Sequence, residues 1–180
     1  MVVEEAMAAR STRFVALFRG INVGKAKRIA MADLRAVFDE LGFTEVKTLL
    51  NSGNVVFTHA GARRGIDQRI EAAVEKELGV ASRTLVLSAK DVATLVEESP
   101  FEEVADPSRL LVATFAGKAG VKQVESLGGD PNFGLGSRAA YLWCPDGVLK
   151  SSLPKELDRL TKKEYTARNW RTLLRIQDAL

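Results

Sequence analysis

A short apolar segment near the start of the chain, residues 13–18, limits the fold more than any other feature. It reads Arg-Phe-Val-Ala-Leu-Phe, and from residue 14 both its odd and its even positions are apolar. Strict alternation would indicate a strand with one solvent-exposed face, whereas an apolar run on both parities indicates a strand covered on both faces. We therefore expect this segment to be the central strand of a sheet.

The rest of the first half alternates between strand and helix patterns. Residues 34–41 place apolar side chains at i, i+3, i+4 and i+7, which predicts an amphipathic helix that ends at Gly42. We further predict strands at about 45–50, 54–58 and 83–87, and a helix at about 64–78.

The resulting order, βαββαβ, is that of the ferredoxin-like arrangement. Ser88 and Asp91 have the spacing of a capping box, which predicts an added helix after the fourth strand. Residues 12–105 are therefore predicted to form a ferredoxin-like subdomain with an added helix.

The second half is less regular. Strands are expected at 110–116 and 139–144 and a short helix near 119–127, and Pro145-Asp146-Gly147 suggests a hairpin. Two helices are expected to close the chain, one starting near Pro154 and one after Thr166 as its N-cap. The fold class is therefore α+β, with residues 1–11 as a disordered leader and 106–180 as a smaller α+β subdomain.

Composition excludes several classes of protein. One cysteine and one histidine leave neither a disulfide framework nor a metal site, so we expect no metal and no cofactor. No apolar run approaches the roughly 18 residues of a membrane span, and no signal peptide precedes the first strand. We expect a cytoplasmic protein without a membrane partner. A net charge of +3 is too small to argue for nucleic acid.

The first polar loop follows the central strand and runs from Arg19 to Arg28. It contains two glycines and four basic residues without an acidic one, and a helix begins near Met31. Backbone N–H groups at a helix N-terminus attract anions. Arg19, Asn22 and Lys25 are therefore candidate ligand-binding residues, although a flexible basic loop has the same composition.

The second polar loop, Asn51-Ser52-Gly53-Asn54, has the composition of a tight hairpin turn. In the βαββαβ order the third strand lies between the first two, so this turn should lie beside the loop that follows Arg19. Asn51, Ser52 and Asn54 therefore join the candidate site.

The third segment, Thr166-Ala-Arg-Asn-Trp170, places Arg168 and Asn169 in the predicted first turn of the last helix. An ordinary capped helix with Trp170 in the core would have the same pattern. We include Arg168 and Asn169 among the candidate ligand-binding residues, and we assign no residue a catalytic role, since the identity of any catalytic group stays open.

Several segments together resemble domain-of-unknown-function family 1697: Phe14 to Gly24, Met31 to Leu34, Asn51 to Phe57, Tyr141 to Gly147 and Thr166 to Trp170. The resemblance spans residue 12 to the C-terminus. It implies a bacterial protein with two α+β subdomains, the first ferredoxin-like, and it implies no activity.

Three functions remain open. The favoured one is binding of a phosphorylated or otherwise anionic, nucleotide-like small molecule at the converging loops. The alternatives are a protein-interaction module without a ligand and a weak nucleic-acid binder, which would use Phe14, Phe18 and Phe57 on its sheet. Whether the protein is an enzyme, and its oligomeric state, stay open.

Overall fold

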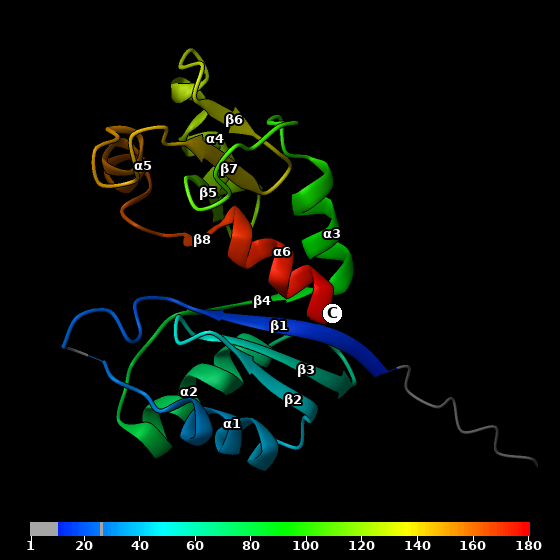
Figure 1. The fold of residues 1–180 in the computed structure, drawn as a ribbon. Coiled ribbons are helices and arrows are strands. Elements are labelled where there is room, and N and C mark those ends of the chain that lie inside the picture. The colour runs from blue at the N-terminus through cyan, green and yellow to red at the C-terminus, as the bar shows by residue number, and fades with distance from the viewer. Residues whose placement is uncertain (1–10, 26) are drawn as a thin grey trace, which may run out of the picture.

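The computed structural model describes residues 11–25 and 27–180. They form two four-stranded antiparallel sheets with helices packed on both sides of each (Figure 1). The α+β class predicted from sequence is confirmed. The predicted leader lies outside the described residues, apart from Ser11, which is the first residue of a strand.

The first sheet has the strand order β2-β3-β1-β4. The apolar segment is β1, which pairs with β3 on one side and β4 on the other. β3 lies between β1 and β2, as expected. The bounds are β1 Ser11–Phe18, β2 Thr44–Leu49, β3 Asn54–Ala60 and β4 Thr84–Ser88.

Helices cover both faces of this sheet, which explains the apolar parity of β1. α1 (Met31–Glu40) and α2 (Ile66–Leu78) pack on one face, where Phe14 and Phe18 of β1 contact the same core as Phe38 of α1. α3 (Ala89–Glu97) packs on the other face. The capping box of Ser88 and Asp91 at its start is confirmed.

The second sheet has the order β6-β7-β5-β8. Its strands are β5 Leu110–Thr114, β6 Phe133–Leu135, β7 Ala139–Trp143 and β8 Thr166–Asn169. Its helices are α4 Lys118–Gln123, the 3-10 helix η1 Glu125–Leu127, α5 Leu153–Thr161 and α6 Trp170–Ala179. No helix in the described part of the chain is long and apolar enough to cross a membrane.

One hydrophobic core joins the two sheets. Val15 and Leu17 of β1 belong to the same buried cluster as Leu95 of α3, Leu173 of α6 and Tyr141 of β7. α3 and α6 contact each other, and α6 lies between the sheets (Figure 1). The two halves of the chain therefore share a core, and the loops at their boundary are held at fixed positions.

Two details of the second half were predicted wrongly. The Pro145-Asp146-Gly147 turn makes no hairpin, because it leads into a short turn segment and then α5. Thr166 does not cap the last helix, because it pairs with Thr114 as the first residue of β8. The cap is Asn169, whose Oδ1 accepts a hydrogen bond from the N–H of Thr172 at 2.9 Å.

Candidate functional site

The first two predicted loops meet, as their topology requires. Nδ2 of Asn22 donates to the carbonyl oxygen of Asn51 at 2.9 Å. One residue before the loop, the N–H of Phe18 donates to the carbonyl oxygen of Gly53 at 2.8 Å. The predicted contact between these segments is confirmed.

Asn22 also closes its own loop. Its Oδ1 accepts from the N–H of Ile29 at 2.8 Å, and its Nδ2 donates to the carbonyl oxygen of Ile29 at 3.0 Å. Its backbone has φ of +55°, a conformation that asparagine tolerates better than most residues. The side-chain amide of Asn22 is thus engaged on both its oxygen and its nitrogen by the protein itself.

Arg168 brings the third segment to the same place from β8. Its Nε donates to Oδ1 of Asn54 at 2.5 Å, and its Nη2 donates to the carbonyl oxygens of Phe18 at 2.7 Å and Ser52 and Gly53 at 3.2 Å. Burial lowers the pKa of Arg168 to about 10, so the group is still charged at neutral pH. A planar guanidinium suits such a set of acceptors, because its donors point in fixed directions.

Asn54 completes this cluster from a fully buried position. Its Nδ2 donates to the carbonyl oxygen of Leu49 at 2.8 Å and to Oγ of Ser52 at 2.9 Å. Asn22, Ser52, Asn54 and Arg168 all bond to the segment of residues 49–54, and we call them the polar junction. The hydrogen bonds of Arg168 join the two halves of the protein at this point.

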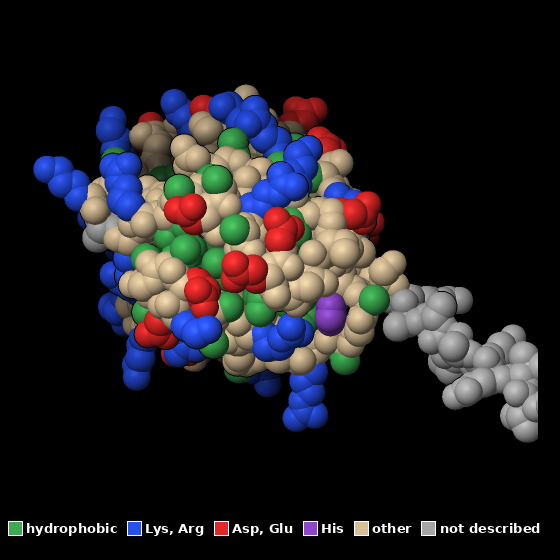
Figure 2. Space-filling model, turned by 90° about the horizontal axis from the view of Figure 1, so that it is seen from below, with side chains coloured by type: hydrophobic (Ala, Val, Ile, Leu, Met, Phe, Trp, Pro, Cys, Tyr) green, Lys and Arg blue, Asp and Glu red, His purple; other side chains and the backbone are tan. Residues whose placement is uncertain are grey.

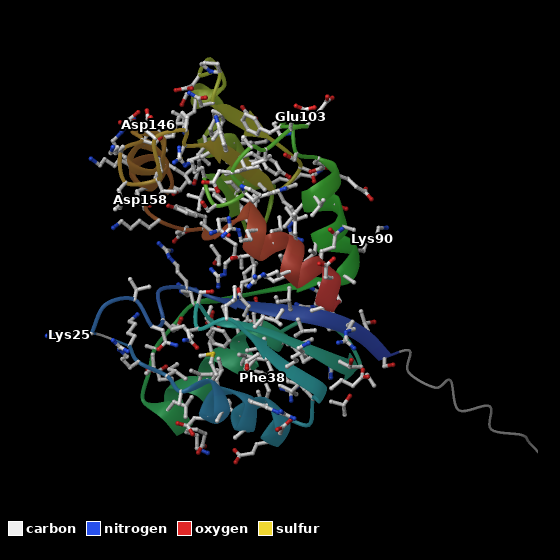
Figure 3. All side chains as sticks on the ribbon, in the orientation of Figure 1. Lys25, Phe38, Lys90, Glu103, Asp146 and Asp158 are labelled. Atoms are coloured by element: carbon white, nitrogen blue, oxygen red, sulfur yellow. The ribbon has the colours of Figure 1, made fainter. Side chains whose placement is uncertain are left out.

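The other predicted residues lie apart from the junction. The guanidinium of Arg19 lies 5.6 Å from the ring centre of Tyr165. Lys25 is exposed at the outer end of its loop (Figure 3). Asn169 is occupied as the cap of α6. The structure thus brings five of the eight candidates together, since Asn51 contacts the junction through its backbone oxygen.

A cavity of about 360 Å³ lies next to the junction, and we call it the loop cavity. It is lined by Asn22, Asn51, Arg28 and the residues that lead into α1, Ile29 to Met31. The N-cap of α1 is Ala30, which provides no side-chain hydrogen bond to the helix. The first N–H groups of a helix have no partner within it, so those of α1 need an acceptor from outside the helix.

A second cavity of about 490 Å³ lies between elements of the two halves, and we call it the cleft. Arg19 is the only predicted site residue that lines it, together with Thr84 at the start of β4 and Tyr165 just before β8. Sequence analysis missed the cleft because its lining comes from several separate segments, none of which forms a motif.

The described residues contain no cluster of three His, Cys, Asp or Glu side chains able to hold a metal ion. Cys144 is buried, and its burial raises the pKa of the thiol. The polar groups that line the two cavities belong to Asn, Gln, Thr, Tyr and charged side chains.

Comparison with known families agrees with the resemblance noted from sequence. The model of the family described as "Protein of unknown function (DUF1697)" matches residues 11–141, which include the first two loops and the first three residues of β7. The chain belongs to the DUF1697 family. No curated protein matches it.

A solved structure of another protein has the same fold. It is the conserved bacterial protein SP0830 from Streptococcus pneumoniae, with a TM-score of 0.76 and 24% sequence identity. The alignment covers 94% of this chain and 98% of the pneumococcal one. At this identity the likeness establishes the fold of this DUF1697 chain over almost its whole length.

Proposed function

We propose that the protein binds a phosphorylated or otherwise anionic small molecule, of nucleotide-like size, in the loop cavity. One observation carries the proposal: a cavity of about 360 Å³ opens at the uncapped N-terminus of α1 and is lined by Asn22 and Asn51. An anionic group at this end of the helix would accept hydrogen bonds from its free N–H groups and interact favourably with its dipole.

Charge at the loop supports an anionic ligand. Arg28 lines the cavity, is exposed, and makes no ion pair with any carboxylate in the described part of the chain. The loop from Arg19 to Arg28 contains four basic residues and no acidic one. Because the amide of Asn22 is already bonded, we assign it the role of shaping the loop, while Arg28 and the side chain of Asn51 contact the ligand.

Two finer features of the fold belong to the same proposal. We infer that residues 12–105 have the ferredoxin-like arrangement, which the antiparallel order β2-β3-β1-β4 and the βαββαβ sequence of elements support. We also infer a boundary near residue 105 between two subdomains, because each of the two sheets draws its strands from one side of it.

A thermal-shift assay with AMP, ADP, glucose 6-phosphate and inorganic phosphate, each at about 1 mM, tests the proposal. A dissociation constant near 10 μM would add about 2.7 kcal/mol of stability. For a chain of this size that is a rise in Tm of roughly 5–10 °C. Absence of any rise across these probes would remove the loop cavity as an anion site.

Two variants locate the binding. Asn51→Ala removes a side chain that has no hydrogen-bond partner among the described residues, while the backbone oxygen that accepts from Asn22 stays in place. Arg28→Met removes the charge that lines the cavity, and Lys25→Met is its control, because Lys25 is on the same loop but outside the lining. Asn51→Ala and Arg28→Met should fold normally and lose the shift, and Lys25→Met should keep it.

The two alternative functions have different consequences. Among the residues that the structure describes, the exposed large apolar side chains are Val23, Leu50 and Leu149, and an interaction module, the second candidate, would need a surface that contains some of them. Both faces of the first sheet are buried, so Phe14, Phe18 and Phe57 offer no platform for bases. The α1–α2 face also mixes acidic and basic side chains rather than presenting one charge (Figure 2).

A further inference from the structure

The cleft is separate from the loop cavity and shares no lining residue with it. Its walls come from both halves of the protein: α2 and the start of β4 on one side, and the end of β5 and the segment from Lys162 to Thr166 on the other. Its volume of about 490 Å³ is in the range of small-molecule sites, which are frequent between domains.

One buried polar atom in the cleft has no partner. Thr84 is only 7% exposed, and its Oγ1 makes no hydrogen bond, although its backbone N–H donates to Oε1 of Glu71 at 2.6 Å. A buried hydroxyl without a partner is unfavourable, and native proteins rarely retain one without a reason. A ligand atom would satisfy it only after a small movement of the cleft wall, because Oγ1 itself has less than 1 Å² of accessible surface.

Two further threonines lie at the same cavity. Thr114 and Thr166 are 3% and 6% exposed, face each other across β5 and β8, and line the cleft with Thr84. Neither hydroxyl is bonded to any residue that the structure describes. Three threonines from two sheets therefore line one cavity.

Charges of both signs surround these hydroxyl groups. The cleft is lined by three basic and three acidic side chains: Arg19, Arg83 and Lys162, and Asp67, Glu71 and Glu164. None of the six forms an ion pair within 4.0 Å in the described part of the chain. The cleft therefore presents charged groups of both signs that are not paired with one another.

This charge pattern selects the class of ligand. A simple anion would be attracted by the three basic groups and repelled by the three carboxylates. A simple cation would be attracted by the carboxylates and repelled by the basic groups. A dipolar molecule with one charge at each end complements both sets. Tyr165 offers an apolar wall rather than a hydroxyl, because its hydroxyl donates to Oδ1 of Asp158 at 2.6 Å.

We propose that the cleft binds a small zwitterion of the α-amino acid class. Its carboxylate would interact with Arg19, Arg83 and Lys162, and its ammonium group with the carboxylates across the cavity. The hydroxyl of Thr84 would gain the hydrogen bond that it lacks. This site is independent of the anion site in the loop cavity.

The test uses the full chain and the common free α-amino acids, each at about 1 mM, in a thermal-shift assay. A rise of roughly 5–10 °C in Tm is expected for at least one of them. The same compound with an acetylated amine, and separately with an amidated carboxyl group, should lose at least half of that rise. Silence across all the amino acids would overturn the proposal. Equal binding of the acetylated form would also overturn it, since the ligand would then be an anion only.

Variants separate this site from general effects. Arg83→Met should lose the amino-acid shift, while Arg64→Met, an exposed basic residue outside the lining, should keep it. Thr84→Val should fold and weaken binding at least tenfold, whereas Thr161→Val, at an equally buried threonine outside the cleft, should bind as the wild type does. Arg28→Met, which disables only the loop cavity, should leave the amino-acid shift unchanged. If Arg28→Met lost the amino-acid shift, the ligand would lie outside the cleft. The same conclusion would follow if both Arg83→Met and Thr84→Val kept the shift.

Discussion

The loop from Arg19 to Arg28 contributes Asn22 to the polar junction and Arg19 to the cleft. The two places differ in whether their buried polar groups have hydrogen-bond partners. At the junction, Asn54 is fully buried and both its amide oxygen and its nitrogen are bonded, and Arg168 donates to five acceptors. In the cleft, the buried hydroxyl of Thr84 has no partner. Polar residues that are satisfied internally stabilise a fold, whereas those left unsatisfied are available to a ligand.

The largest effect is expected from breaking the junction. Arg168→Met removes a donor to Asn54 and to three carbonyl oxygens, and it leaves the buried Oδ1 of Asn54 without a partner. We expect a loss of about 3 kcal/mol in the free energy of unfolding, measured with urea. Arg168→Lys should recover only part of it, because an ammonium group cannot reproduce the planar fork. A loss below about 1 kcal/mol would mean that the junction contributes little to the fold.

A smaller loss is expected from crowding the same junction at Gly53. This residue has φ of +79°, and an added Cβ would lie 2.5 Å from Cδ1 of Ile21 and 2.9 Å from Cβ of Phe18. Gly53→Ala should cost about 2–3 kcal/mol. Gly24→Ala is the control, because its φ is +64° but nothing lies within 4 Å of the added atom, so only the backbone cost of about 1 kcal/mol remains. Equal urea midpoints for the two variants would refute the close packing at Gly53.

How far the sequence predicts this molecule depends on the range of the interactions. The first half was predicted well, because the apolar periodicity of β1, α1 and α2 reports directly on which face is buried. β8 was missed since its four residues, Thr166 to Asn169, are mostly polar and become a strand by pairing with β5.

The candidate site shows the same limit. Topology predicted that the loops of Asn22 and Asn51 would meet, and they do. The hydrogen bond from Arg168 to Asn54 joins residues that are 114 positions apart in the sequence. Whether it forms depends on how the two sheets pack, which the spacing of residues in the sequence does not predict. The cleft was not predicted for the same reason, because Thr84 and Thr166 become neighbours only in the folded chain.

At the cleft, removing a buried polar group should raise the free energy of unfolding instead of lowering it. Thr84→Val replaces an unbonded buried hydroxyl with a methyl group of similar shape, so the free protein should gain about 1 kcal/mol. Thr161 is the matched contrast, since it is 2% exposed and its hydroxyl donates to the carbonyl oxygen of Leu157 at 2.7 Å. Thr161→Val should lose about 1 kcal/mol in the same urea titration. A loss for Thr84→Val would show that its hydroxyl is satisfied in solution.

The smallest effect on stability is expected at Asp91, which lies in a third cluster of polar side chains. As at the junction, its polar atoms have hydrogen-bond or ion-pair partners within the protein. Burial alone would raise the pKa of Asp91, but hydrogen bonds from Ser88 and the guanidinium groups of Arg138 and Arg63 together hold it below its ordinary value. A lowered carboxyl pKa contributes stability above the unfolded value of about 3.9, and that contribution is lost as the pH falls below it.

Urea titrations at a series of pH values below about 5 measure this loss. The wild type should lose more stability with falling pH than Asp91→Asn, which has no carboxyl group to protonate at this position. Parallel curves for the two proteins would show that Asp91 is not stabilised in its charged form.

The most direct measurement is an NMR titration of the isotope-labelled wild-type protein with AMP and with the amino acid that gives the largest thermal shift. AMP should move the backbone N–H signals of Asn22 and of Met31 at the loop cavity, and the amino acid should move those of Thr84 and Thr166 in the cleft. The Nε–H signal of Arg168 should stay in place in both titrations, because its partners are already within the protein. A shift of the Arg168 signal larger than those at either cavity would contradict the account, since the junction would then be the ligand site itself.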